Sequence, residues 1–452
     1  MLASLVSAIN DFMYGKLLIV MLMGGGAYYT LRTGFIQVRM LKETLRVILE
    51  KPEKDTGVSS FQALMVSTAS RVGTGNIVGV ASALCLGGFG AMFWMWIAAF
   101  LGGASAFIEN TLAQIYKKRG EVSSYGGPAY YIESAFKSRF LAILFSFALI
   151  ATYGFGFNLL CSFNLQSTFD SYAFYDESTT PWIIGGILAL LASALVPVMD
   201  VFYIAVAVVV TLMNVNNLPD VFTRIFSEAF DFEAIFGGLA GSCLMLGIKR
   251  GLYSNEAGVG SAPNAAAAAD VSHPVKQGLV QMFSVFIDTL LLCSATAFMC
   301  MSSGVETTKE LAGAPYVQAA LAATMGDWAR IFITVSMILF AFTTLLGNLY
   351  YVDNCLAYIF GRLPGRTFMT CYRIIACIII FVGAGSSMDL LWDISDFTTG
   401  LMALINLPVI CILGRPALNA LKDYRQQRRE GKNPVFLAKH IGLKTKTNYW
   451  QG

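Results

Sequence analysis

Long apolar runs, separated by short polar or Pro/Gly-containing joints, fill most of this chain of 452 residues. Eleven of the runs are candidates for membrane-spanning helices. The alternative to separate fifth and sixth spans is one long helix over 181–215, but Pro197 and Asp200 favour a break there. The pattern therefore predicts an all-α polytopic membrane protein with spans at about 13–31, 59–86, 90–116, 139–169, 181–196, 198–215, 232–260, 275–302, 328–360, 367–385 and 390–413.

Basic residues gather in alternate joints between these runs, as is typical of cytoplasmic loops. The acidic joint 170–177 falls on the opposite side. Merging the fifth and sixth runs would spoil this alternation, whereas eleven spans with the N-terminus outside and the C-terminus in the cytoplasm preserve it. The cytoplasmic basic residues are Arg32, Arg39, Lys42, Arg46, Lys51, Lys54, Lys117, Lys118, Arg119, Lys137, Arg139, Lys276, Arg362, Arg366, Arg425, Arg428, Arg429 and Lys432.

Composition agrees with a membrane protein and argues against several other classes. Hydrophobic residues make up 56% of the chain and charged residues 13%, and the mean hydropathy is +0.63. A net charge of +3 gives no reason to expect nucleic acid as a partner. Nine cysteines stand singly and only two histidines are present, so we expect no disulfide framework, metal cage or other cofactor. We expect multi-pass insertion in the lipid bilayer of the cell membrane, without an obligatory protein partner.

The most informative segment is Ser70–Gly79, where an arginine, an asparagine and several glycines interrupt an apolar run. A membrane helix satisfies its own backbone groups, so a polar, glycine-rich break is tolerated only where it faces protein, water or a ligand. We interpret Gly73–Asn76 as a binding-site break. The alternative is a helix-packing surface of small residues, in which Arg71 and Asn76 would be costly.

A second interruption falls in the run 232–260, which contains Gly247–Gly251 and then Ser254–Gly258. Apart from the first span, the spans divide into two sets of five, 59–215 and 232–413, which enter the membrane from opposite sides. The first span of each set is interrupted. Paired interrupted helices in two inverted halves are typical of the substrate site of a secondary transporter.

Such breaks suit an amino-acid zwitterion at the middle of the membrane. Gly73 and Gly75 let the backbone approach a ligand closely. Thr74 and the helix that restarts at Asn76 offer N–H groups to the carboxylate of the amino acid. Carbonyl groups of the unwound segment accept hydrogen bonds from its ammonium group. A channel would instead show a continuous polar stripe on several helices, and an intramembrane enzyme would need a nucleophile with a base or metal ligands. We therefore expect one transport domain over 1–413, followed by a short basic tail against anionic lipid.

Four blocks occur in the same order as in a known family: Ser70–Gly79, Gly87–Ile97 continuing to Gly103, Ser124–Tyr131 and Ser254–Pro263. They resemble the sodium:alanine symporters, the alanine/glycine:cation symporter family, and the likeness runs from about residue 15 to 413. The resemblance implies one N-terminal helix plus a 5+5 inverted repeat of the leucine-transporter type with two broken helices. It also implies sodium-driven import of small neutral amino acids.

The resemblance further implies a sodium site beside the first break. In transporters of this inverted-repeat fold, carbonyls just before the break and hydroxyls on the eighth core helix hold the ion. At the matching positions of this sequence, the implied sodium ligands are the carbonyls of Ala69, Val72 and Phe340 and the hydroxyls of Thr343 and Thr344. The alternative for the threonine pair is hydrogen bonding back to the preceding turn.

Side-chain selectivity must come from residues outside the break, because the break would hold the groups common to all amino acids. The substrate candidates there are Asn158, Cys161, Tyr253, Asn255, Thr344 and Asn348. Many alanine-transporting relatives have Trp at the position of Asn348 and Gln at that of Cys161, so this chain departs from the pattern that it resembles. Asn164 and Gln166 are possible substitutes for that glutamine. For the amides, bonding between helices is the alternative role.

Three carboxylates lie within the apolar runs. Asp288 is in mid-span, where an ionised carboxylate must be paired, and we expect a structural bond to Arg71, Arg250 or a helix end in preference to proton coupling. Glu109 and Glu256 lie nearer the cytoplasmic ends, where hydration or a basic partner is easier, and we expect gating or structural roles for them.

The sequence therefore predicts a sodium-coupled symporter that imports alanine or glycine by alternating access, with sodium and amino acid loading together. Two alternatives stay open within the same class. One is a symporter of a larger polar neutral amino acid such as glutamine or serine, which Cys161 and Asn348 suggest. The other is a proton-coupled variant.

Overall fold

Helices account for all the regular elements in the part of the chain that the structure describes. It is a computed structural model, and it describes residues 2–50, 58–120, 124–191, 199–231, 242–443, 445 and 447–451. Two isolated β-bridges, between Val58 and Ala269 and between Lys118 and Tyr125, are the only strand-like pairings in those residues. The all-α expectation is confirmed.

The helices of the first half, some interrupted by π-helical (η) turns, are α1 (Leu2–Phe12), η1 (Met13–Leu18), α2 (Ile19–Thr33), α3 (Ile36–Arg39), α4 (Leu41–Ile48), α5 (Ser60–Arg71), η2 (Gly75–Gly79), α6 (Val80–Gly87), α7 (Gly90–Ile115), α8 (Pro128–Phe136), α9 (Arg139–Leu149), η3 (Ile150–Gly156), α10 (Phe157–Gln166), α11 (Thr180–Leu191), α12 (Met199–Met213) and α13 (Leu218–Ala229). Those of the second half are α15 (Cys243–Asn255), α16 (Pro263–Ala266), α17 (Pro274–Phe286), η7 (Ile287–Cys293), α18 (Ser294–Ser302), α19 (Ala314–Met325), α20 (Trp328–Phe360), α21 (Arg366–Ala384) and α22 (Met388–Arg429). Short 3-10 turns (η4, η5 and η8) complete the set.

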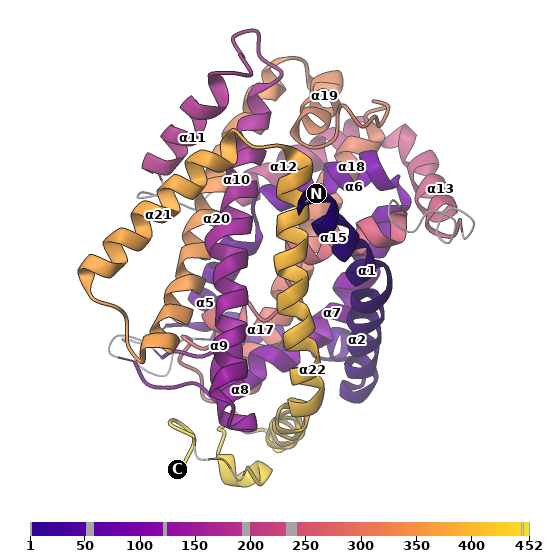
Figure 1. The fold of residues 1–452 in the computed structure, drawn as a ribbon. Coiled ribbons are helices and arrows are strands. Elements are labelled where there is room, and N and C mark those ends of the chain that lie inside the picture. The colour runs from indigo at the N-terminus through magenta and orange to yellow at the C-terminus, as the bar shows by residue number, and fades with distance from the viewer. Residues whose placement is uncertain are drawn as a thin grey trace.

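Seven of the described helices are long and apolar enough to cross a membrane, and an eighth span is possible if the bent pair Tyr203–Met213 and Val215–Ala229, with an angle of 72°, counts as one. Figure 1 shows the helices of the protein as a bundle in which α5, α17 and α20 lie near the centre and α11 and α21 lie together at one edge. The protein is thus an all-helical, multi-pass membrane protein.

Each of the eleven predicted runs contains a helix in its described part, but one prediction about their interior is wrong. The run 232–260 is not interrupted at Gly247–Gly251, because α15 continues through these residues to Asn255. A Cβ placed on Gly247 would lie 2.4 Å from the Ala91 carbonyl oxygen of α7. This glycine allows close helix packing and does not break the helix. The break expected between 181–196 and 198–215 falls at residues 192–198, outside the described part.

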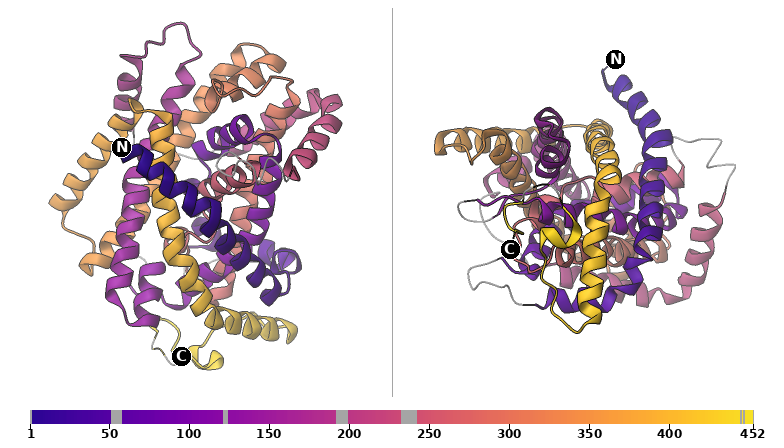
Figure 2. Two further views of the ribbon diagram at one scale, coloured as in Figure 1. Left: turned by 45° about the vertical axis from the view of Figure 1, so that its right-hand side comes forward. Right: turned by 90° about the horizontal axis from the view of Figure 1, so that it is seen from below.

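Several short helices were not predicted, namely α3, α4, α8, α13, α16 and α19. The last long helix also continues beyond the predicted end at residue 413, to Arg429. The tail that follows folds back on the bundle, where the Phe436 N–H donates to the Ser272 carbonyl and the Trp450 indole donates to the Gln114 carbonyl at 2.8 Å. In Figure 2, the view from below shows this yellow segment across one end of the helices.

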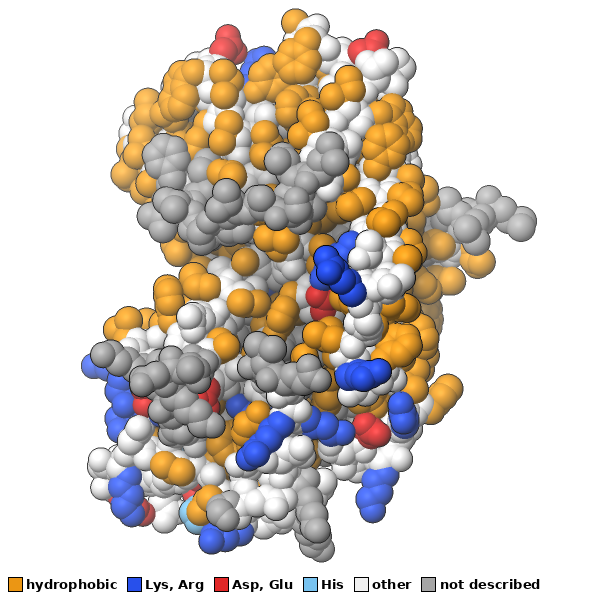
Figure 3. All heavy atoms as spheres, turned by 90° about the vertical axis from the view of Figure 1, so that its left-hand side faces the viewer, with side chains coloured by type: hydrophobic (Ala, Val, Ile, Leu, Met, Phe, Trp, Pro, Cys, Tyr) orange, Lys and Arg blue, Asp and Glu red, His pale blue; other side chains and the backbone are white. Residues whose placement is uncertain are grey.

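The surface agrees with insertion in a bilayer. Many large apolar side chains are exposed on the long helices, among them Ile374, Ile375 and Ile378 of α21. In Figure 3, apolar side chains cover most of the upper part of the face shown, whereas Lys and Arg gather toward the lower end. In Figure 1 the C-terminus also lies at that lower end.

Candidate functional site

The first predicted break is present, and it is narrower than expected. Helix α5 ends at Arg71, and Val72 has an extended backbone with φ −72° and ψ 101°. The chain becomes helical again at the π-helical turn η2, which begins at Gly75. The break is therefore centred on Val72 and Gly73, in the buried interior.

Two backbone carbonyls lose their helical donors at this break. The N–H of Gly73, which would serve the carbonyl of Ala69 in a continuous helix, donates to Asn76 Oδ1 at 2.9 Å. The N–H of Asn76, which would serve Val72, donates to the Gly73 carbonyl at 3.2 Å. The predicted ligand carbonyls of Ala69 and Val72 thus lack the N–H donors that a continuous helix would give them.

Thr344 of α20 lies directly against this break. A Cβ placed on Gly73 would lie 1.9 Å from Thr344 Oγ1, so only glycine fits there. The Thr344 hydroxyl is buried and has no hydrogen-bond partner among the described residues, although buried hydroxyls normally have one. By contrast, the neighbouring Thr343 hydroxyl donates to the Phe340 carbonyl at 3.0 Å, the back-bonding alternative. The structure therefore places Thr344 and Thr343 in different roles.

Asn76 connects the two interrupted segments. Its Nδ2 donates to Asp288 Oδ1 at 2.8 Å and to Ser254 Oγ at 3.1 Å, and Ser254 Oγ donates to Asp288 Oδ2 at 2.6 Å. Together with its bond to Gly73, these contacts engage both ends of the Asn76 amide within the protein. Asp288 therefore holds η2, α15 and η7 together.

Neither of the two arginines expected as partners of Asp288 bonds to it. Arg71 donates to Ser284 Oγ at 2.8 Å and lies 3.9 Å from Glu256, and Arg250 pairs with Asp396 at 3.1 Å. Asp288 accepts instead from neutral side chains, Thr289 at 3.2 Å being the third. Sequence could not show this, because the choice between nearby cations depends on how the helices are rotated.

The second break follows α15. Glu256 adopts a left-handed conformation with φ 55°, and Gly258 and Gly260 also have positive φ, which glycine tolerates best. The Asn255 side chain caps this turn, since its Oδ1 accepts from the Ala257 N–H at 3.0 Å. The interruption predicted at Ser254–Gly258 is confirmed.

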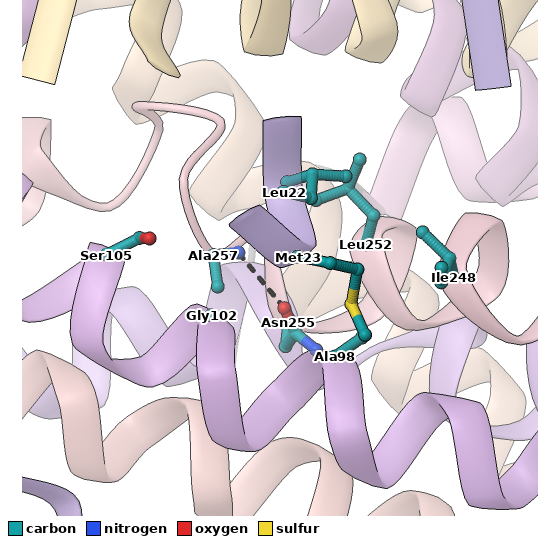
Figure 4. Close-up of a pocket in the computed structure, with 9 residues that line it drawn as sticks. All are labelled: Leu22, Met23, Ala98, Gly102, Ser105, Ile248, Leu252, Asn255 and Ala257. Atoms are coloured by element: carbon teal, nitrogen blue, oxygen red, sulfur yellow. Dashed lines mark hydrogen bonds between the residues drawn. The ribbon is translucent and has the colours of Figure 1, made fainter. Parts of the chain in front are cut away.

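Asn255 does not join the other substrate candidates. Figure 4 shows it beside Ala257 in a small crevice lined by Leu22 and Met23 of α2 and by Ala98 of α7. Its Nδ2 donates to Thr289 Oγ1 at 3.0 Å. The Asn255 side chain is therefore occupied within the second break, where it caps the turn and bonds to Thr289.

Tyr253 lies over the first break. A Cβ placed on Gly75 would lie 2.7 Å from the Tyr253 ring, and that ring packs edge-on against Phe157 and Trp392, with centroids 4.6 and 4.9 Å away. Arg250 stacks on Trp392 at 3.6 Å. These aromatic rings close the site on one side.

A buried ion cluster, which the sequence pattern did not predict, continues from this aromatic stack. Asp396 lies 3.1 Å from Arg250 and 3.5 Å from Lys249, and all three side chains are buried. The signal was available, because Asp396 is a carboxylate within an apolar run, as Asp288 is. A buried ion pair between α15 and α22 holds the two helices in one arrangement.

The remaining candidates lie on α10 and on the same face of α20. Asn348 Nδ2 donates to Asn158 Oδ1 at 2.9 Å, and the Cys161 thiol lies 3.5 Å from the Ala341 carbonyl. Asn164 Nδ2 donates to Thr74 Oγ1 at 3.2 Å. The amides of Asn158 and Asn348 therefore bond to each other between helices, the alternative role for them, and Asn164 is the amide that reaches the break.

The two other carboxylates are fully enclosed. Ser261 Oγ donates to Glu256 at 2.6 Å and Arg71 lies 3.9 Å away, so the expected basic partner is present. Glu109 accepts from the Asn406 amide at 2.8 Å and from the Gly258 N–H at 3.3 Å. The hydrated surroundings considered for Glu109 are not found, because its side chain is 0% exposed.

Six of the predicted substrate residues meet at the break: Gly73, Thr74, Gly75, Asn76, Tyr253 and Thr344. Three others lie beside the break, between α10 and α20: Asn158, Cys161 and Asn348. Asn255 lines a separate crevice. No group of three or more His, Cys, Asp or Glu residues in the described part of the chain is arranged to hold a metal ion. A cation at this site would have to use carbonyl and hydroxyl oxygens, which hard cations accept.

Known proteins are similar to this chain over almost its whole length. A profile of the sodium:alanine symporter family matches residues 1–438. The chain is 43% identical to the amino-acid carrier protein AlsT of Bacillus subtilis, over 98% of this chain and 96% of the relative. It is 42% identical to the probable sodium/glutamine symporter GlnT of the same organism, over 98% and 95%. It is 37% identical to the sodium/alanine symporter AgcS of Methanococcus maripaludis, over 95% and 99%. The chain therefore belongs to the sodium:alanine symporter family of amino-acid transporters.

Proposed function

We propose that this protein imports a small neutral amino acid, alanine or glycine, together with sodium by alternating access. The observation that carries the proposal is the pairing of two opposed breaks, one after Arg71 and one after Asn255, joined through Asn76 and Ser254. Backbone groups freed at both breaks suit the carboxylate and ammonium groups of an amino acid.

Sodium would bind where the first break meets α20. The carbonyls of Ala69 and Val72 have lost their helical donors, and the buried Thr344 hydroxyl lies against Gly73. The Phe340 carbonyl and the oxygen of the Thr343 hydroxyl, which can keep its hydrogen bond to that carbonyl, would complete an all-oxygen site. Because this site and the substrate site share the break, binding of one ligand would favour binding of the other.

The proposal includes a topology of eleven spans, with one N-terminal helix before two inverted sets of five over 59–215 and 232–413. The long helices would supply most of these spans, α5 with α6 would supply the first broken span, and α15 would supply the described part of the second. The N-terminus would lie outside and the tail 414–452 in the cytoplasm. Clustering of Lys and Arg at the end that carries the tail supports this orientation (Figure 3).

Uptake of labelled alanine by proteoliposomes tests the proposal. An inward sodium gradient should drive accumulation above equilibrium, and replacement of sodium by choline should abolish it. Unlabelled glycine should compete. Uptake that is unchanged without sodium would contradict the coupling, and competition by glutamine alone would contradict the choice of substrate.

A larger polar amino acid such as glutamine or serine is the second candidate. One relative at 42% identity is named a probable sodium/glutamine symporter, and Asn158, Asn348 and Asn164 offer amides beside the break. An Asn348→Ala variant distinguishes the candidates. It should weaken competition by glutamine more than competition by glycine if these amides hold the substrate side chain.

A proton-coupled symporter is the third candidate. The buried carboxylates Glu109 and Glu256 favour it. A relative from Bacillus sp. is also named a sodium/proton-dependent alanine carrier protein. Uptake driven by a pH gradient in the absence of sodium would support it. Loss of that uptake in Glu256→Gln, with sodium-driven uptake retained, would assign the proton to this side chain.

A further inference from the structure

A cavity of about 240 Å³ opens at the end of the bundle that carries the C-terminal tail. It lies among the ends of three helices: α8, the first residues of α9 and the last turn of α20. Helix ends of a membrane protein lie at the level of the lipid headgroups. The proposed transport mechanism uses none of the residues that line this cavity.

The side chains around the cavity are predominantly basic. Lys118, Arg119, Arg139 and Arg362 line it, and Glu133 is the only carboxylate among the described residues that line it. Glu133 is itself occupied, because the Tyr358 hydroxyl donates to it at 2.9 Å and Lys118 lies 3.8 Å away. The cavity therefore has a clear excess of positive charge.

The basic residues at this site differ from others at the same end of the molecule in having few acidic partners. Among the residues that the structure describes, Lys118 is the only one of the four in an ion pair. By contrast, Arg46 and Arg428 both contact Glu43, and Lys276 contacts Glu50 at 2.7 Å. Three arginines line one cavity, and none of them forms an ion pair with a carboxylate of the described residues.

The local backbone fixes where these side chains stand. Lys118 and Tyr125 exchange two backbone hydrogen bonds of 2.7 and 2.9 Å, which bring both ends of the loop to the cavity wall. Arg139 is the first residue of α9, and its guanidinium reaches the Ile359 carbonyl at 3.4 Å. Arg362 directly follows Gly361, the left-handed residue that ends α20.

We propose that this cavity binds the phosphate of an anionic phospholipid headgroup. Arginine binds phosphate through several N–H donors, and basic pockets between membrane helices bind anionic headgroups. The Tyr130 and Tyr358 rings, 5.0 Å apart in the same wall, are of the type enriched at the membrane interface. A bound headgroup would clamp the end of α20, the helix that carries Thr344, to α8 and α9.

Purified protein in phosphatidylcholine vesicles, with and without phosphatidylglycerol, tests this proposal. Native mass spectrometry measures the lipid retained, and thermal unfolding measures its effect on stability. Phosphatidylglycerol should be retained and should raise the Tm. The double variant Arg139→Gln with Arg362→Gln should lose about thirtyfold in lipid affinity, equivalent to about 2 kcal/mol at about 1 kcal/mol per basic residue.

The matched control is Arg366→Gln with Arg415→Gln, which removes the same charge from exposed residues that do not line the cavity. It should retain the lipid like the unmodified chain. Arg139→Lys with Arg362→Lys should keep most of the effect, because the charge remains. Arg362 is exposed, so the single variant Arg362→Gln should fold and show part of the loss.

Free phosphate is the other source of the same chemistry. Inorganic phosphate added to vesicles of phosphatidylcholine alone should leave the Tm unchanged. A rise in Tm that depends on Arg139 and Arg362 would overturn the lipid assignment in favour of a soluble phosphate compound. Equal lipid retention by the cavity double variant and the control double variant would overturn the site itself.

Discussion

Thr344 is the residue on which the proposed coupling most depends. Its hydroxyl is buried against Gly73 and bonds to no described residue, whereas the other three Ser and Thr hydroxyls of the same helix bond back to the preceding turn. A side chain held in this way offers its oxygen to a ligand at the break. The fit also explains why residue 73 must be glycine.

Thr344→Ala should raise the sodium concentration needed for half-maximal uptake by about tenfold or more, since the loss of one oxygen ligand is comparable to the loss of a strong hydrogen bond. Alanine uptake at several sodium concentrations measures this effect. Ser336→Ala is the control, because the Ser336 hydroxyl bonds back to the Phe332 carbonyl at 2.8 Å on the same helix. Equal sodium dependence in the two variants would rule out Thr344 as a ligand.

Helix α15 illustrates, at the scale of an element, how glycine can serve two purposes. Gly247 lets α15 approach the Ala91 backbone of α7, so it belongs to a helix contact. Gly258 and Gly260 allow the positive φ values of the break. A search for glycine-rich segments cannot separate these purposes, because both leave the same pattern in the sequence.

Gly247→Ala should therefore destabilise the protein by about 1–3 kcal/mol, the usual cost of overpacking. Gly251→Ala is the matched control one turn further on, where a Cβ would meet Met95 at an ordinary contact distance of 3.7 Å. Thermal unfolding in detergent measures both. A Tm for Gly247→Ala equal to that for Gly251→Ala would show that α15 and α7 are not in tight contact.

At the scale of the whole molecule, the C-terminal tail forms part of the folded structure. Trp450 is buried between Phe436 and the end of α7, and the Ala438 N–H donates to the Trp450 carbonyl at 2.8 Å. Lys117 lies 5.4 Å from the Trp450 ring. The tail thus ties the end of α7 to the segment that follows the second break.

Trp450→Ala should release this tail, since truncation of a buried tryptophan costs about 3–5 kcal/mol. Limited proteolysis should then cleave beyond Arg429 faster, while the transmembrane core stays intact. Val435→Ala, at a residue 54% exposed, should leave the rate unchanged. Equal cleavage of both variants would show that Trp450 does not anchor the tail.

The attachment of the tail should also depend on pH through His273. Burial lowers the pKa of His273 below its ordinary value of 6.5, and Lys276 and His440 act in the same direction, although Asp423 opposes them. The environment of His273 under the attached tail therefore disfavours the protonated imidazole. When the tail detaches, His273 can bind a proton at its ordinary pKa. Attachment is strongest at neutral pH and weakens as the pH falls through about 6.5.

Tail proteolysis at pH 7.5 and at about pH 5.5, corrected for protease activity, measures this dependence. His273→Gln should abolish it, because glutamine does not titrate. A rate that rises equally on acidification in the variant would assign the pH effect to another group.

The sequence by itself determined the membrane character, the family, the helical runs and the first break. These features depend on local composition: apolar length decides what can cross a bilayer, and glycine with polar residues marks where a helix can open. Tertiary structure alone decided the partners of Asp288, the ion cluster at Asp396, the separation of Asn255 from the site and the folding back of the tail. Each depends on the rotation and approach of helices distant in sequence, and no local pattern records these.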